Sequence, residues 1–98
     1  MLASMSAQVA ESASRATTMP LADVLDRWID GEGHGWVTEA VWLLTHDRQR
    51  MNELIASIRQ HGILEPILLG TDGRVWDGHH RIVVAWLLRL REVPVKYA

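Results

Sequence analysis

The sequence predicts a single small α+β domain, and three observations lead to this prediction. The chain has 98 residues, of which 48% are hydrophobic, so it can form one domain with a compact core. Residues 48–60 repeat apolar side chains with the period of a helix, whereas residues 66–76 contain two short apolar runs around an Asp-Gly pair. A strongly apolar segment and a Val-Pro-Val run follow. The second half of the chain is therefore expected to run helix, strand, strand, helix, strand.

The N-terminal residues 1–18 are rich in Ala, Ser and Thr and show no sustained period, so we expect a flexible tail there. The folded domain is expected over residues 19–98. At its start, residues 19–24 fit a short strand and residues 22–29 fit a short helix, and the sequence allows both.

Two helices are expected in the middle of the chain. The Gly-rich residues 31–35 form a flexible break, after which Thr38 is a candidate N-cap for a short helix over the apolar residues 37–44. Asp47 is the expected N-cap of a longer helix over residues 48–60. The apolar residues of this second helix lie on one stripe: Met51, Leu54, Ile55 and Ile58.

Gly62 is expected to end that helix as a C′ glycine. Residues 66–69 and 74–76 are then predicted as two strands. A two-residue hairpin turn at Asp72 and Gly73 is expected to join them.

The last two elements are a helix and a strand. Gly78 is expected to open a helix that runs to about Leu90, and its residues 82–88 are apolar nearly all round. Such a helix is buried on several sides or forms a subunit contact. Residues 93–97 are predicted as the final strand, and Pro94 indicates an edge strand or a proline at the first ladder position.

The formal net charge of −2 is unevenly distributed. Residues 1–47 hold two basic and seven acidic side chains, whereas residues 48–98 hold eight basic and five acidic ones. The basic half suits a phosphate-bearing ligand, but its excess is far short of the basic stripe that binds nucleic acid. A solvated surface with a chance imbalance is the alternative.

Composition also excludes some classes of function. The chain has no cysteine, so disulfides and thiolate chemistry are excluded. No apolar run approaches the roughly 18 residues of a membrane span, and the first residues lack the pattern of a signal peptide, so a cytoplasmic protein is expected. The chain has five tryptophans, most of which we expect in the core or at an interface.

The most informative run is Asp77-Gly78-His79-His80-Arg81, between a predicted strand and a predicted helix. Gly78 at a helix N-terminus can accept a phosphate, and Arg81 can add a bidentate contact. His79 and His80 can donate hydrogen bonds, but neighbouring residues on a helix point about 100° apart, so this pair is not expected to bind a metal. Asp77 is a candidate magnesium ligand or a partner that orients a histidine. The alternative is a structural box in which Asp77 caps the helix and Arg81 pairs with an acid.

A second loop, residues 62–66, contains Glu65 directly before Pro66, which favours an extended backbone. Its carboxylate is a candidate general base or metal ligand, and a solvated loop glutamate is the alternative. His34, His46 and His61 are assigned no function.

These two loops also carry a family likeness. Residues 54–67 resemble the L-x-x-S-I-x-x-x-G-(I/L)-x-x-P-I box of the ParB N-terminal domain. Residues 75–81 and 93–95 are similar to the rest of that domain, and residues 19–24 resemble its opening strand. The resemblance to the ParB/sulfiredoxin superfamily implies a small α+β domain with a mixed sheet packed against helices.

The resemblance implies a nucleotide, ATP or CTP with magnesium, bound between the two boxes. It also implies that any enzymatic activity is that of a nucleotide phosphohydrolase or phosphotransferase. The nucleotide-binding residues that it implies are Gly62, Ile63, Pro66, Gly78, His79, His80 and Arg81. The catalytic residues, as base or magnesium ligand, are expected to be Glu65 and Asp77.

This sequence departs from the family at the box itself. Sulfiredoxins have a cysteine at the position of His79, so their reductase chemistry is excluded here. Partition proteins have a glutamate and an arginine at the positions of His79 and His80. They continue into a helix-turn-helix region, whereas this sequence stops at Ala98. We therefore expect a stand-alone domain of bacteriophage or mobile-element type.

Two alternatives to nucleotide binding remain open. The first is a non-enzymatic interaction module that forms a homodimer through the apolar helix 82–90 or binds a host or phage protein. The second is a DNA-associated or nuclease-like protein with a degenerate box, which the charge distribution does not support.

Overall fold

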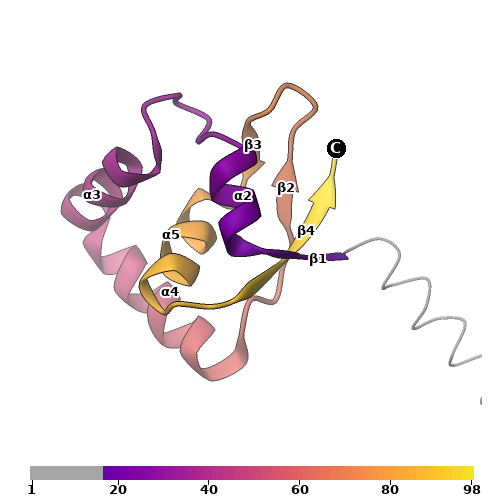
Figure 1. Ribbon diagram of the computed structural model, residues 1–98. Coiled ribbons are helices and arrows are strands. Elements are labelled where there is room, and N and C mark those ends of the chain that lie inside the picture. Colours follow the sequence, from indigo (N-terminus) through magenta and orange to yellow (C-terminus); the bar gives the residue numbers. More distant parts are fainter. Residues whose placement is uncertain (1–16) are drawn as a thin grey trace, which may run out of the picture.

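The computed structural model describes residues 17–98, which fold into a four-stranded sheet with its helices to one side (Figure 1). The elements in chain order are β1 (Thr17–Pro20), α2 (Leu21–Arg27), α3 (Trp36–His46), α4 (Arg48–His61), β2 (Ile67–Leu69), β3 (Val75–Asp77), α5 (His79–Leu87) and β4 (Glu92–Tyr97). The predicted order of the second half is confirmed.

The sheet is mixed, with the strand order β1-β4-β2-β3. β1 pairs with β4 and β2 pairs with β3 in antiparallel fashion, whereas β2 and β4 are parallel. Helix α5 lies between β3 and β4 in the chain and makes the crossover that a parallel pair requires. The α+β class with a mixed sheet packed against helices is therefore confirmed.

The prediction that Pro94 marks an edge strand is wrong for β4 as a whole, because β4 lies between β1 and β2. β1 pairs with residues 92–95 of β4, whereas β2 pairs only with residues 95–97. At Pro94 the strand therefore has a neighbour on one side only. A residue without an N–H is tolerated at such a local edge.

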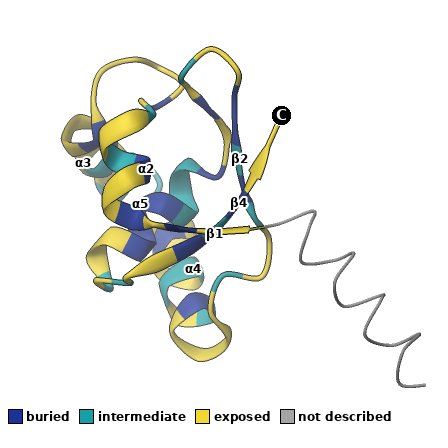
Figure 2. Cartoon of the chain, turned by 45° about the vertical axis from the view of Figure 1, so that its right-hand side comes forward, coloured by how far each residue is buried: buried dark blue, intermediate teal, exposed yellow. Residues whose placement is uncertain are grey.

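Helix α5 is the centre of the core, as its apolar sequence predicted (Figure 2). Four consecutive residues of α5 are fully buried: Ile82, Val83, Val84 and Ala85. They share one core with the inward-facing side chains of the sheet, which include Ile67, Leu69, Val93 and Val95. Met51 and Ile58 of α4 complete it on the helical side. Burial on several sides, one of the two expected explanations of the apolar helix, is confirmed.

Helix α5 ends at Leu87, not near Leu90 as predicted. Arg89 has a φ of 57°, and its N–H donates to the carbonyl of Trp86 over 3.1 Å. The Leu90 N–H donates to the carbonyl of Ala85 over 2.9 Å. These two bonds form a Schellman motif, so the helix is closed by a left-handed residue that is not glycine.

The N-terminal elements combine both expected alternatives, because strand β1 is followed at once by helix α2. The strand includes Thr17 and Thr18, which were assigned to the tail; the rest of that tail lies outside the described residues. The predicted cap at Thr38 is wrong, because α3 begins two residues earlier and Gly35 stands at its N-cap position. A glycine with a φ of 94° starts this helix without a capping side chain.

The predicted hairpin joins β2 to β3, but its turn is longer by one residue than expected. The Gly70 N–H donates to the carbonyl of Arg74 over 2.7 Å, which leaves residues 71–73 in the turn. Gly73 has a φ of 79°, the left-handed position that three-residue hairpin turns need.

The other predicted glycine, Gly62, follows α4 with a φ of 73° as expected. Among residues 17–98 there is no helix long and apolar enough to cross a membrane.

Candidate functional site

The two loops singled out in the sequence are tied together by Arg81. Its Nη1 donates to the backbone carbonyls of Glu65 and Pro66 over 2.8 and 2.7 Å. Its Nη2 donates to the Asp77 carboxylate over 3.1 Å. The Arg81 side chain is 16% exposed, so it is a largely buried link between the two boxes. The structure therefore brings Glu65, Pro66, Asp77 and Arg81 together, and the pairing of Arg81 with an acid is the contact that the structural alternative predicted.

His80 ties the start of α5 to the start of α4. Its Nε2 donates to the Asp47 carboxylate over 2.8 Å. Asp47 occupies the N-cap position of α4, but its side chain makes no capping hydrogen bond. Asp47 thus stands at the predicted N-cap position, but the prediction that its side chain caps the helix is wrong, because the carboxylate bonds His80 instead.

His79 points to a different part of the chain. Its Nε2 accepts the N–H of Gly31 over 2.7 Å, and its ring lies 5.8 Å from that of Trp36. Since Nε2 accepts a hydrogen bond, the proton of the neutral ring is on Nδ1. The two adjacent histidines therefore contact separate segments. Residues 31–35, expected to be a flexible break, are anchored on the domain by this contact and by a bond from Arg74 Nη1 to the Gly31 carbonyl over 2.9 Å.

A cleft of about 350 Å³ lies between α4 and the start of α5. Its lining residues on α4 are Arg50, Glu53, Leu54 and Ser57, and those at the start of α5 are Asp77, Gly78, His80 and Arg81. A second hollow of about 290 Å³ shares part of this lining and reaches Gly62, Ile63 and Glu65. We refer to the two together as the α4–α5 cleft. Pro66 and His79 do not line it.

The N-terminus of α5 opens at this cleft with its backbone donors uncapped. The first helical bond runs from the Ile82 N–H to the Gly78 carbonyl, so the preceding N–H groups have no partner within the helix. Among residues 17–98 no side chain caps this terminus, and its first turn has no acidic residue. Gly78 has a φ of 110°, and a Cβ there would lie 3.0 Å from Cγ1 of Ile67. Backbone geometry and packing both require glycine at this position.

The two candidate catalytic carboxylates lie at the rim of the cleft. Asp77 is 68% exposed at its side chain and is paired with Arg81. Glu65 is exposed, and the contact it makes with Arg81 is through its backbone carbonyl. Their roles as general base or magnesium ligand remain predictions.

Sequence reasoning missed Arg50, which lines both parts of the α4–α5 cleft. The signal was present, because Arg50, Leu54 and Ser57 are spaced by four and three residues and so share one face of α4.

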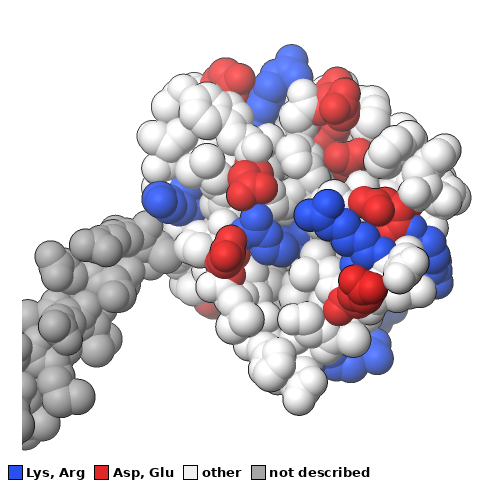
Figure 3. All heavy atoms as spheres, turned by 180° about the vertical axis from the view of Figure 1, so that it is seen from behind, with Lys and Arg blue, Asp and Glu red and all other residues white. Residues whose placement is uncertain are grey.

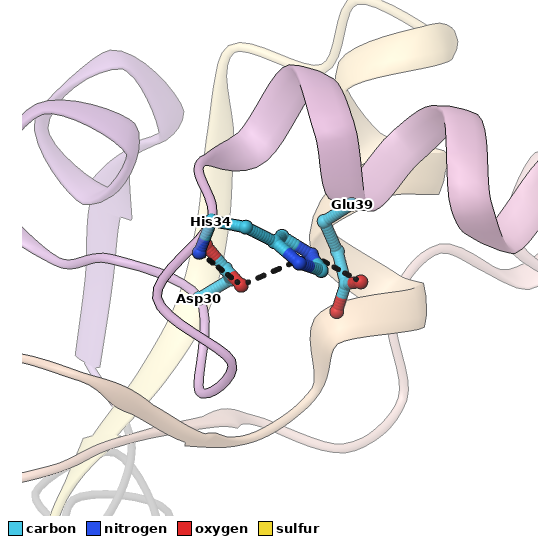
Figure 4. A group of neighbouring side chains, drawn as sticks. All are labelled: Asp30, His34 and Glu39. Carbon is cyan, nitrogen blue, oxygen red and sulfur yellow. Dashed lines mark hydrogen bonds and ion pairs between the residues drawn. The ribbon is translucent and has the colours of Figure 1, made fainter.

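Sequence reasoning also missed a cluster formed by Asp30, His34 and Glu39 (Figure 4). The Asp30 side chain is fully buried and that of Glu39 is 8% exposed. The Nε2 of His34 lies 3.4 Å from Oδ2 of Asp30 and 3.2 Å from Oε1 of Glu39. Three residues on a loop and a helix start have no periodic pattern, so the sequence offered no signal for them beyond residue type.

Burial by itself raises the pKa of Asp30, but other groups outweigh it and the pKa lies below its usual value. The N–H of Gly35 donates to Oδ1 over 2.7 Å, and the N–H of His34 lies 3.4 Å from Oδ2. The neighbouring His34 ring lowers the pKa further. Asp30 is therefore held in its charged form although it is buried.

The protein is thus a small α+β domain whose candidate ligand cleft lies between α4 and the N-terminus of α5. Comparison with known families shows to which family this domain belongs. The model of the ParB N-terminal domain matches residues 43–98. The chain belongs to the ParB N-terminal domain family.

One curated relative is the ParB-like nuclease domain-containing protein YnaK of Escherichia coli K12. It is 35% identical over 51 residues, which make up 52% of this chain and 59% of YnaK. The match thus spans little more than half of that protein.

Two solved structures share the fold. Sulfiredoxin from Arabidopsis thaliana has a TM-score of 0.57 at 24% identity, over 85% of this chain and 83% of the other. A Pnob8-like ParB-N domain has a TM-score of 0.55 at 13% identity, over 84% of this chain and 28% of the other. These structures, with the family match, confirm the predicted resemblance to the ParB/sulfiredoxin superfamily.

Proposed function

We propose that this domain binds a nucleotide, ATP or CTP with magnesium, in the α4–α5 cleft. The observation that carries the proposal is the uncapped N-terminus of α5, which opens into the cleft beside Arg50 and Arg81 without an acidic residue in its first turn. Backbone N–H groups and the helix dipole at such a terminus favour a phosphate. Family membership supports the same location, because the two matching boxes border the cleft.

In this proposal the residues divide into three roles. The first N–H groups of α5 and the guanidinium of Arg50 bind the phosphates. The loop at residues 62–66 forms a wall of the site, and Arg81 holds that loop against the start of α5. Glu65 or Asp77 binds the magnesium ion or acts as the base if a phosphoryl group is transferred or hydrolysed. Catalysis of this kind consists mainly of positioning and charge neutralisation.

The direct test is the thermal midpoint of the protein with magnesium and ATP, CTP, GTP or UTP at millimolar concentration. A nucleotide present at about 100 times its dissociation constant adds about 2.7 kcal/mol to the free energy of unfolding. For a domain of this size the midpoint then rises by roughly 10 to 20 °C. The nucleotide that raises the thermal midpoint is identified as the ligand. No rise with any of the four contradicts the proposal.

Arg50→Ala is expected to weaken nucleotide binding by roughly 10- to 100-fold, because a charge-assisted hydrogen bond contributes about 1.5–3 kcal/mol. The measurement is titration calorimetry. Arg59→Ala is the matched control: Arg59 is an exposed arginine on the same helix but does not line the cleft, so its removal is expected to leave the affinity within about twofold. Equal losses of nucleotide affinity in the two variants would mean that the overall charge of the protein, and not a contact of Arg50 in the cleft, favours binding.

A second candidate function is protein interaction, and an apolar groove of about 340 Å³ between α3 and α5 favours it. Its lining residues are Val37, Ala40, Val41, Leu44, Trp86 and Leu87. Val37 is 67% exposed and Leu87 is 47% exposed, although both are large apolar side chains. Of the five tryptophans, Trp36 is buried and Trp28 packs against the core. The expectation of mostly core or interface tryptophans therefore holds only if a partner covers surfaces such as this one.

If the groove forms the homodimer that helix 82–90 suggested, Trp86→Glu is expected to shift the protein from dimer to monomer in sedimentation equilibrium, because a charge would be placed in an apolar contact. Trp76→Glu is the control, since Trp76 is 51% exposed and lies outside the groove. A wild-type protein that is monomeric at all concentrations would rule out the dimer.

The DNA-associated alternative has no comparable support, because basic and acidic side chains are interleaved on the face shown in Figure 3.

A further inference from the structure

Asp30, His34 and Glu39 form a second cluster of polar groups, separate from the α4–α5 cleft. One oxygen or nitrogen atom of each residue lies within 4.8 Å of the other two. His34 and Glu39 also line a hollow of about 370 Å³, on whose wall His79 and His80 lie. Figure 4 shows the His34 ring between the two carboxylates.

This cluster contains two acidic side chains and one histidine. Asp30 is fully buried and Glu39 is 6% exposed, and in the part of the chain that the structure describes neither carboxylate is paired with an arginine or a lysine. His34 is the one basic group between them. Backbone N–H groups of Gly35 and His34 hold the Asp30 carboxylate, and a bound cation would offset the remaining excess of acidic over basic side chains.

The distances are compatible with a metal ion as well as with the hydrogen bond between Nε2 of His34 and Glu39. The contacts of 3.4 and 3.2 Å from Nε2 of His34 are longer than the roughly 2.7–2.9 Å of charge-assisted hydrogen bonds. Ligands at about 2.0–2.1 Å around a tetrahedral zinc ion are separated from one another by about 3.3–3.4 Å. Moreover, one ring nitrogen carries at most one proton, whereas Nε2 faces two carboxylates.

The donor atoms are also held in position. The Gly35 N–H bonds Oδ1 of Asp30 over 2.7 Å, which leaves Oδ2 facing the His34 ring. The preceding residue, Ile29, is attached to the end of the sheet, because it exchanges backbone hydrogen bonds with Gly73 and Val75. Such supporting contacts orient the ligands of metal sites.

We propose that Asp30, His34 and Glu39 bind a divalent transition-metal ion of the zinc type, with a fourth position open to the hollow. An imidazole with two carboxylates suits zinc or a similar ion better than magnesium or calcium, which prefer ligand sets of oxygen alone. Three protein ligands and an open position are typical of sites where a metal holds water or a substrate.

The test is zinc binding to the full chain, measured by competition with a chromophoric chelator and by the thermal midpoint. The wild type is expected to bind one zinc ion, and millimolar magnesium is expected not to displace it. Glu39→Gln and His34→Gln are each expected to weaken zinc binding by at least tenfold. His61→Gln is the control, because His61 is an exposed histidine at the end of α4 and is not part of the cluster.

Cobalt provides a readout that a purely structural role would not change. The proposal expects the intense visible absorption of tetrahedral cobalt(II) in the wild type and in His61→Gln, and its loss in Glu39→Gln. Should all variants bind zinc equally, or should the wild type bind none, the proposal is overturned. Either outcome is independent of nucleotide binding, which uses other residues and is measured with magnesium.

Discussion

Gly78→Ala is expected to lower the free energy of unfolding by about 2–5 kcal/mol, the sum of backbone strain and overpacking. A φ of 110° is unfavourable for any residue with a Cβ, and the added Cβ would lie 3.0 Å from Cγ1 and 3.3 Å from Cα of Ile67. The Cα of a fully buried strand residue cannot move away as the end of a flexible side chain can. The measurement is chemical denaturation, with a thermal midpoint expected to fall by roughly 10 to 25 °C.

Gly73→Ala is the matched control for this variant. Gly73 also has a positive φ, of 79°, but a Cβ there would meet no atom of the described part of the chain within 4 Å. This variant carries the strain without the clash, so its loss is expected to be about 1 kcal/mol. Equal losses at the two positions would show that the contact with Ile67 relaxes and that glycine is needed at residue 78 for backbone conformation alone.

Arg81→Ala is expected to lower the free energy of unfolding by about 2–4 kcal/mol and to weaken nucleotide binding at the same time. The guanidinium donates to two backbone carbonyls, and each hydrogen bond from a charged group contributes about 1.5–3 kcal/mol. The upper end of the sum is reduced because the Glu65 carbonyl is exposed and can bond water instead. Stability is measured by denaturation, and binding by calorimetry well below the midpoint of the variant.

Asp77→Ala separates the two kinds of contact that Arg81 makes. It removes the ion pair but keeps both carbonyl bonds, and the Asp77 side chain of the pair is 68% exposed. A loss within about 1 kcal/mol is therefore expected. If Asp77→Ala were as destabilising as Arg81→Ala, the ion pair and not the link between the two loops would be the main contribution of Arg81.

Local pattern predicted much of the fold. The apolar stripe of residues 51–58 and the positive φ of Gly62 account for α4 and its end. The apolar run at residues 82–85 predicted the buried helix at the centre of the core. These features are decided within a few residues of chain, by helical period and by the conformational freedom of glycine.

The predictions that were wrong concern residues whose partners lie far away in the sequence. Pro94 lies in an interior strand because the two neighbours of β4 pair with different halves of it. Asp47 stands at a helix start but bonds His80, which is 33 residues away in the sequence. The packing of α4 against α5 determines such hydrogen-bond partners, and no local sequence pattern predicts them.

The sequence by itself determined the α+β class, the family and the loops that border the candidate nucleotide site, because short motifs and periodicities carry that information. Only the tertiary structure decided that Arg81 bonds the carbonyls of the opposite loop, that His79 and His80 contact separate segments, and that Asp30, His34 and Glu39 converge. The physical reason is that directional hydrogen bonds and buried charges depend on distances of a few ångströms between elements, which are fixed when the helices pack on the sheet.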